Sequence, residues 1–177
     1  MPTLKITLDT ASLDNAIKYL RDYQKRLESA GEEIARRLSQ MGYEVAFRVL
    51  EGHVYTGETI GNLEVVQTEP NKFVLQTEST AILFLEFGAG VTKGYGHPDV
   101  GNFGPGTYPG KGHWNDPNGW WYPTDDPQLV KYTDKDGQGW AHTYGTAPQM
   151  PFYQAYTTMK DNILKIAKEV LSNGNRN

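Results

Sequence analysis

The strongest constraint on this chain is a heptad series of apolar residues between residues 12 and 52. The first series comprises Leu13, Leu20, Leu27, Ile34 and Met41, and a second series four positions later comprises Ile17, Leu38 and Val45. Side chains at this spacing lie along one face of an α-helix. Gln24 and Gly31 interrupt the second series. The pattern therefore predicts either one long helix over 12–52 or two helices with a kink or break near Gly31, with Ser12 or Asp14 as the N-cap.

The charged residues of this segment alternate in sign. Three Glu–Arg pairs stand four residues apart in the favourable order on a helix: Glu32–Arg36, Glu33–Arg37 and Glu44–Arg48. This interleaving favours a solvated, salt-bridged face over a basic stripe. The whole chain has 17 Lys and Arg against 21 Asp and Glu, a formal charge of −4. Such a balance does not suit a dedicated nucleic-acid binder.

The later segments predict further regular elements. Residues 62–68 and 72–77 read as two strands joined by the turn Glu69-Pro70-Asn71, which indicates an antiparallel hairpin. The apolar run 81–87 fits a buried strand or a short helix. A C-terminal helix begins near Pro151, and its predicted apolar face comprises Tyr156, Met159, Ile163, Ile166, Ala167 and Val170. We expect one soluble α+β domain over 1–177, with helices packed on a small antiparallel sheet.

Residues 91–146 differ in composition from the rest of the chain. They contain 11 of the 19 glycines, six of the ten prolines and all four tryptophans. We interpret them as an insertion with little regular structure, ordered partly or wholly by a partner. The expected binding anchors are aromatic: Trp114, Trp120, Trp121, Tyr122 and Trp140. Such rings serve protein–protein interfaces as well as sugar-stacking platforms, and the sequence favours neither by chemistry alone.

Catalytic and metal chemistry finds little support in the residues. The chain has no Cys, which excludes disulfides, thiolate zinc sites and Cys nucleophiles. His97, His113 and His142 lie near several Asp residues of the insertion, but none of them has a metal-ligand spacing, so hydrogen-bonded or solvated histidines are favoured. Glu86 stands in an apolar run. It is expected to bond backbone N–H groups of the following Gly88–Gly90 turn rather than to act as a general acid. We expect no cofactor and no enzyme activity.

Three motifs resemble a phage family. Residues 84–90 (Phe-Leu-Glu-Phe-Gly-Ala-Gly) resemble the E-F-G motif of the small tail-component proteins of lambdoid tailed phages, a gene-product-ten-like family related to minor tail protein Z of lambda. Residues 147–155 resemble the Pro-Phe element that opens the family's last helix. Thr56-Gly57 with Gly61-Asn62-Leu63 is a split version of the family's compact Thr-Gly-x-Leu. The matching residues are Glu86, Phe87, Gly88, Gly90, Pro148, Pro151 and Phe152.

The resemblance covers nearly the whole chain and has implications for function. It implies a non-catalytic virion protein, made in the host cytoplasm, that acts at the head–tail junction or in tail completion. It also implies assembly as a ring, expected to be sixfold, against terminator, stopper or connector, and tail-tube proteins, with DNA passing through a lumen. A carbohydrate-binding module using the insertion aromatics is the alternative. No membrane partner is expected, because the longest apolar run, 81–85, is too short for a bilayer span.

Overall fold

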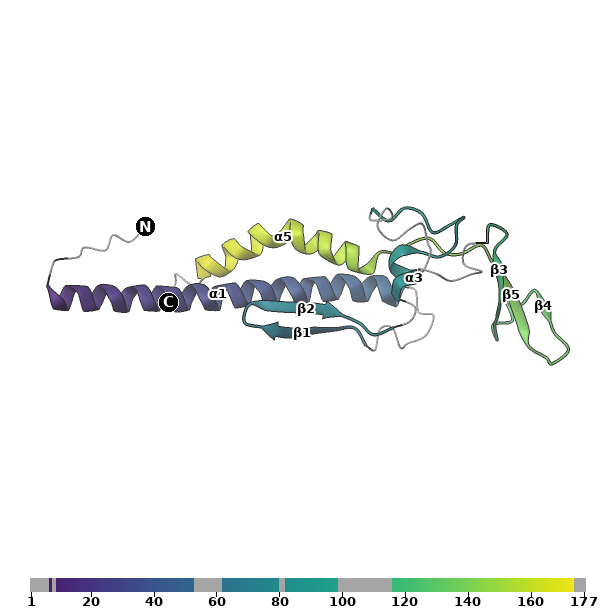
Figure 1. The fold of residues 1–177 in the computed structure, drawn as a ribbon, viewed down its shortest axis with the longest axis horizontal. Coiled ribbons are helices and arrows are strands. Elements are labelled where there is room, and N and C mark those ends of the chain that lie inside the picture. Colours follow the sequence, from purple (N-terminus) through teal and green to yellow (C-terminus); the bar gives the residue numbers. More distant parts are fainter. Residues whose placement is uncertain (1–6, 8, 53–61, 80–81, 99–115, 174–177) are drawn as a thin grey trace.

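The computed structural model describes residues 7, 9–52, 62–79, 82–98 and 116–173. The molecule is elongated along one long helix, α1 (Thr10–Glu51), with a second helix, α5 (Pro151–Asn173), and a β-hairpin beside its C-terminal half (Figure 1). A small three-stranded sheet stands at the far end. The α+β class is confirmed. No helix among these residues is apolar over enough of its length to cross a membrane.

Helix α1 is continuous through Gly31, so the interpretation with a break there is wrong. A Cβ added at Gly31 would lie 3.4 Å from the Asn71 Oδ1 atom of the hairpin turn, which is ordinary contact. The cap is Asp9 rather than Ser12 or Asp14, because the Asp9 carboxylate accepts the Ser12 backbone N–H at 2.8 Å. The helix therefore begins slightly earlier than its apolar pattern, since capping depends on one hydrogen bond rather than on periodicity.

Helix α5 packs closely on the C-terminal half of α1. A Cβ added at Gly42 would lie only 2.7 Å from the sulfur of Met159, so this glycine permits the close approach of the two helices. Small residues continue the contact, because Ala46 and Ala155 are fully buried in the core beside Leu50. Small side chains at a helix crossing bring the two backbones together and extend their van der Waals contact.

The predicted hairpin is confirmed. Strands β1 (Glu64–Glu69) and β2 (Lys72–Gln76) pair antiparallel around the turn, where Asn71 takes a left-handed conformation with φ of 63°. The hairpin lies along α1 on a different side from α5 (Figure 1). Apolar residues of the hairpin region, Leu63 and Leu75, join the core formed by the two long helices. The described part of the apolar run forms a short helix, α3 (Ile82–Phe87), rather than a strand.

The expectation of little regular structure in 91–146 is wrong for its second half. Strands β3 (Trp120–Pro123), β4 (Tyr132–Thr133) and β5 (Gly139–Thr143) form an antiparallel sheet in the order β3-β5-β4. The strands are short, which is why the composition conceals them. Asp134 makes the β4–β5 turn by accepting the backbone N–H groups of Asp136 and Gln138 at 3.0 Å. Such side-chain-supported turns let a Gly- and Asp-rich segment pair its own strands.

Candidate interaction surfaces

Glu86, on α3, joins two distant parts of the chain. Its carboxylate accepts the backbone N–H groups of Phe152 and Tyr153, at 2.8 Å each, in the first turn of α5. Glu86 Oε1 also lies 3.2 Å from Nε2 of buried His97. The ring of His97 packs between those of Phe87 and Tyr153, at centroid distances of 4.5 and 5.3 Å. We call this cluster the Glu86 junction.

The expected partner of Glu86, the Gly88–Gly90 turn, is therefore wrong. The first N–H groups of a helix have no partner within the helix, and the helix dipole favours negative charge at this end. A buried carboxylate at the start of α5 both accepts these N–H groups and supplies negative charge. The backbone adds to the junction, because the carbonyl of Leu85 accepts the N–H groups of Gln149 and Met150 at 2.7 and 3.2 Å.

The two glycines of the E-F-G motif lie where the segment after α3 crosses the segment before α5, and this crossing requires glycine. Gly88 and Gly90 have φ values of 80° and 81°, in the left-handed region that favours glycine. A Cβ at Gly88 would lie 2.7 Å from the Thr146 carbonyl oxygen and 2.9 Å from Pro148. Between the glycines, Ala89 exchanges two 2.9 Å backbone hydrogen bonds with Thr146. The motif residues thus meet one another, with Pro151 fully buried and Phe152 packed on the core.

The outer sheet carries a continuous row of rings on one face. Trp121 stands opposite His142 and Tyr132 opposite Trp140 in the strand register, and Tyr144 continues the row. The ring centroids are 4.9 Å apart for Trp121–His142 and for His142–Tyr144, and 5.3 Å apart for Trp121–Tyr132. Trp121, Tyr132 and Tyr144 are each about half exposed. We call these five residues the aromatic face.

The position of the Trp140 ring is fixed by a hydrogen bond. Its indole Nε1–H donates to the Asp134 carboxylate at 2.8 Å, and the ring lies nearly parallel to that of Tyr132, at 8°. Donation from Trp140, followed by the backbone N–H of Gln138, holds the pKa of Asp134 below its usual value. The aromatic face is thus held in place by the same turn residue that joins β4 to β5.

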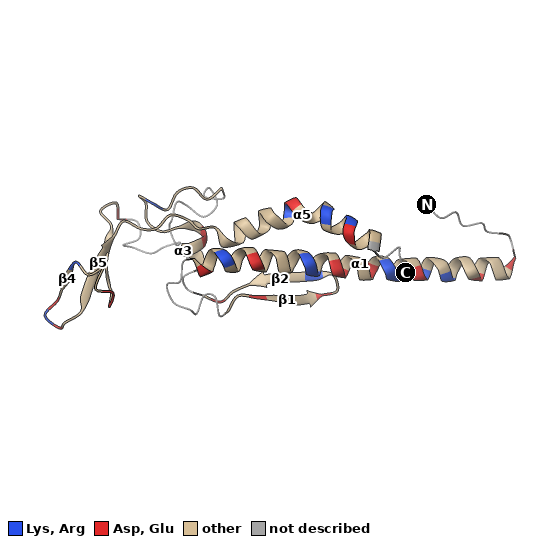
Figure 2. Ribbon diagram, turned by 180° about the vertical axis from the view of Figure 1, so that it is seen from behind, with Lys and Arg blue, Asp and Glu red and all other residues tan. Residues whose placement is uncertain are grey.

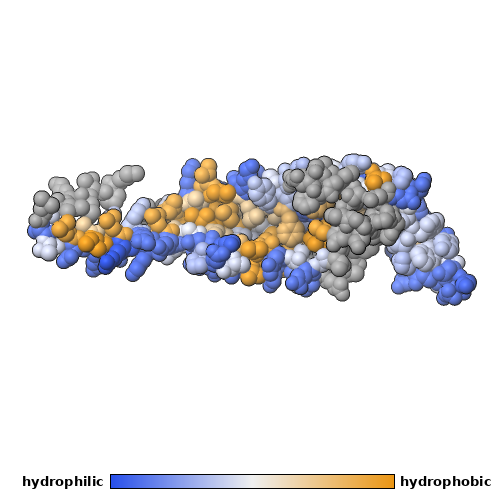
Figure 3. Space-filling model, viewed as in Figure 1, coloured by the Kyte–Doolittle hydropathy of each residue, from blue (hydrophilic) through white to orange (hydrophobic). Residues whose placement is uncertain are grey.

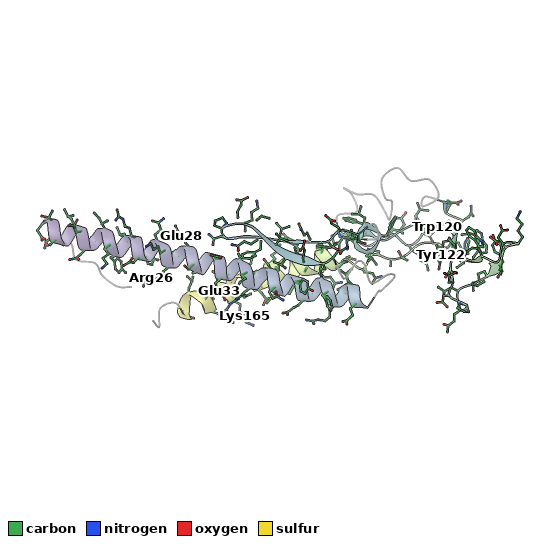
Figure 4. All side chains as sticks on the ribbon, turned by 90° about the horizontal axis from the view of Figure 1, so that it is seen from below. Arg26, Glu28, Glu33, Trp120, Tyr122 and Lys165 are labelled. Carbon is green, nitrogen blue, oxygen red and sulfur yellow. The ribbon has the colours of Figure 1, made fainter. Side chains whose placement is uncertain are left out.

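The five aromatic anchors expected from the sequence do not share one surface. Trp121 and Trp140 lie on the aromatic face, whereas Trp120 and Tyr122 alternate to the opposite face of β3, at the end of the molecule away from the start of α1 (Figures 1 and 4). Trp120 is buried, and its ring contacts the position where Gly90 would carry a Cβ. Trp114 lies outside the described residues. Alternation along the strand could have separated these residues into two faces, because neighbouring side chains in a strand point to opposite faces.

The histidines occupy different surroundings. His97 belongs to the Glu86 junction and His142 to the aromatic face, while His113 lies outside the described residues. No group of three or more His, Asp and Glu residues is arranged to hold a metal ion within the described part of the chain.

Two helical surfaces leave apolar side chains exposed. On α1, Leu13, Ile17, Leu20 and Leu27 are 44–57% exposed, and orange side chains extend along α1 beyond the end of α5 (Figure 3). On α5, the outward residues are Tyr156, Ile163, Leu164 and Leu171. Tyr156 and Ile163 were expected on the buried face, but Met159, Ile166 and Val170 provide that face. Charged residues alternate along the middle of α1 (Figure 2).

Comparisons with protein-family models, with curated proteins and with solved structures find no match to this chain. Its function is therefore inferred from the geometry of the chain and from the motif resemblance.

Proposed function

We propose that this chain is a structural virion protein of a tailed phage, acting at the head–tail junction or in tail completion as a ring subunit. The observation that carries the proposal is the number of apolar surfaces that an elongated subunit leaves exposed. They lie on the N-terminal half of α1, on the outer side of α5 and on the aromatic face. Large exposed apolar patches mark interaction surfaces, and a ring subunit requires more than one.

The motif resemblance supports the same proposal. The residues that carry it, Glu86 to Gly90 and Pro148 to Phe152, form the junction that fixes α5 and the outer sheet to the body. Their side chains serve the fold rather than a reaction. The net charge of −4 suits a conduit for DNA, because a basic lining would retard the genome as it passes. The proposed neighbours are the terminator, stopper or connector, and tail-tube proteins of the virion.

The test is the mass of the purified chain by light scattering, with negative-stain images of the same fraction. We expect rings, sixfold in the simplest case, and we expect Trp121→Ala combined with Tyr132→Ala to prevent them while leaving the helical CD signal. The control is Tyr95→Ala, which removes an equally exposed aromatic ring outside the sheet. Normal rings from the double variant would overturn the role of the aromatic face. Failure of the unaltered chain to form rings at any concentration would contradict the ring itself.

A second candidate is a carbohydrate-binding module. The exposed, hydrogen-bond-fixed aromatic face favours it, because flat rings stack on the apolar faces of sugars. Retention on cell-wall polysaccharide that is lost in the Trp121→Ala, Tyr132→Ala variant would support this candidate. Retention unaffected by these substitutions, or its absence, counts against it.

A further inference from the structure

The first half of α1 carries an apolar stripe whose side chains are 44–57% exposed, although Ala16 on the same half is buried. Leu13, Ile17, Leu20 and Leu27 follow the heptad spacing of the whole helix. Later members of the same series, Ile34 to Val45, are partly buried. The end of α5 reaches α1 near a groove that Val170 lines together with Lys25, Arg26, Ser29 and Ala30. Residues 10–27, which we call the free arm, thus continue a helix-packing seam beyond its partner (Figures 1 and 3).

We propose that the free arms of two copies of this chain pair as an antiparallel coiled coil. Leu13, Leu20 and Leu27 occupy d positions and Ile17 occupies an a position, so that these four apolar side chains line one seam, which Gln24 interrupts at the next a position. In this arrangement the stripe of one copy packs against the same stripe of the second copy. An isologous contact of this kind closes on itself and leaves the aromatic face and α5 free.

The charged residues beside the stripe favour one register of the antiparallel pair. Asp14, Arg21 and Glu28 follow the three leucines at the e positions, and all three are exposed. In an antiparallel pair the e positions of the two helices face each other. If Ile17 of each copy packs against Leu20 of the second copy, then Asp14 of each copy faces Arg21 of the second copy. Two opposite-charge pairs thus flank the central apolar layers.

Other arrangements lose this complementarity. A slide of one heptad in either direction places Asp14 opposite Glu28 or opposite a second Asp14, and both pairs repel. In a parallel pair the e positions face the g positions, which are Ala16, Tyr23 and Ala30, so no ion pair forms. A parallel pair would also place α5 and the hairpin of both copies at the same end of the coiled coil.

The length of the arm agrees with the same register. Ile17 against Leu20 places Thr10, the first residue of α1, opposite Leu27 of the second copy. The overlap therefore uses the whole free arm, about 27 Å of helix, and ends beside the groove that Val170 of α5 lines. Since the overlap is under three heptads, the pairing is expected to be weak and dependent on concentration.

The first test is a charge exchange followed by sedimentation equilibrium. Asp14→Arg and Arg21→Asp should each weaken dimerisation about tenfold, and the two together in one chain should restore it. Asp14 and Arg21 lie two turns apart on one helix, so restoration requires contact between copies. Leu20→Asp should abolish the dimer. The matched control, Asn15→Asp on the opposite side of the helix, should leave it unchanged.

The second test uses the absence of cysteine from the natural chain. Ile17→Cys and Leu20→Cys variants are prepared separately, mixed and oxidised. The proposed register predicts a disulfide between the two variants and little within either one, because Cβ atoms must approach to about 4 Å. Disulfides formed mainly within each variant would indicate parallel pairing and overturn the proposal. A chain that stays monomeric up to about millimolar concentration would also overturn it.

This pairing does not rest on the proposed function, and the two fail differently. If rings form but show no cross-link between positions 17 and 20, the ring proposal stands and the arm pairing is overturned. If a cross-linked dimer forms but never assembles into larger particles, the arm pairing stands and the ring proposal is overturned. Both together predict two rings joined through their arms, with dihedral symmetry.

Discussion

The two halves of α1 have the same heptad pattern but different surroundings. In the second half, Gly42 and Ala46 lie against α5, and Leu50 is 2% exposed. The heptad series of Leu20 continues at Ile34 and Met41, which are partly buried, whereas Leu20 itself, in the first half, is 57% exposed. The comparison teaches that an apolar stripe specifies a contact without specifying its partner. The chain supplies a partner for one half, and we propose that a second copy supplies the other.

The largest expected difference is between two leucine truncations. Leu50→Ala should lower the free energy of unfolding by about 3 kcal/mol, because it leaves a cavity in the core. Leu20→Ala should lower it by less than about 0.5 kcal/mol at dilute concentration, where the arm is unpaired. Urea denaturation followed by CD at low micromolar concentration measures both. A comparable loss from Leu20→Ala would show that the chain itself covers the arm.

The Glu86 junction fixes α5 over the covered half of α1. Glu86→Gln should lower the free energy of unfolding by about 2 kcal/mol, because a neutral amide replaces the carboxylate that accepts two N–H groups of α5. The control is Glu64→Gln, an exposed change on β1. Hydrogen exchange of the Phe152 and Tyr153 amides would locate the effect. Unchanged protection of these amides would be inconsistent with the role given to Glu86.

Alanine substitutions at two glycines of α1 distinguish the effect of packing on stability from the effect of helix propensity. Gly31→Ala and Gly42→Ala gain the same propensity, about 1 kcal/mol, but only the second brings a Cβ within 2.7 Å of Met159. The Gly31→Ala variant should therefore be the more stable of the two by about 1–2 kcal/mol, measured by thermal or urea unfolding. Equal stabilities would mean that α5 does not pack closely at Gly42.

The smallest effect concerns Glu33. Hydrogen bonds from Arg36 and then Arg37 lower the pKa of Glu33 to about 2 from 4.5. Because the folded-state pKa is depressed, the stabilisation is fully present above pH 4.5 and is lost as the pH falls towards 2. The three side chains are 31–56% exposed, so Glu33→Gln should remove no more than about 0.5 kcal/mol, and only above this window. Denaturation midpoints between pH 2 and 6, with Glu44→Gln as the control, test this.

Much of the fold follows from local patterns. The heptad series predicts α1 to within two residues of its observed start, and the turn at Pro70-Asn71 predicts the hairpin. Pro151 predicts the first residue of α5. The outer sheet could not be predicted in this way, because strands of two to five residues in a Gly-rich segment carry no clear alternation. Their pairing depends on turn hydrogen bonds such as those to Asp134.

The sequence by itself determined where the two long helices and the hairpin form, because these depend on residues a few positions apart. Only the tertiary structure decided which surfaces remain exposed. Glu86 meets Phe152, 66 residues away, and Trp120 is buried while its neighbour Trp121 is exposed. The same heptad spacing gives a partly buried seam at one end of α1 and a half-exposed stripe at the other. Periodicity fixes the face of a helix, but burial of that face depends on which distant segment the chain brings to it.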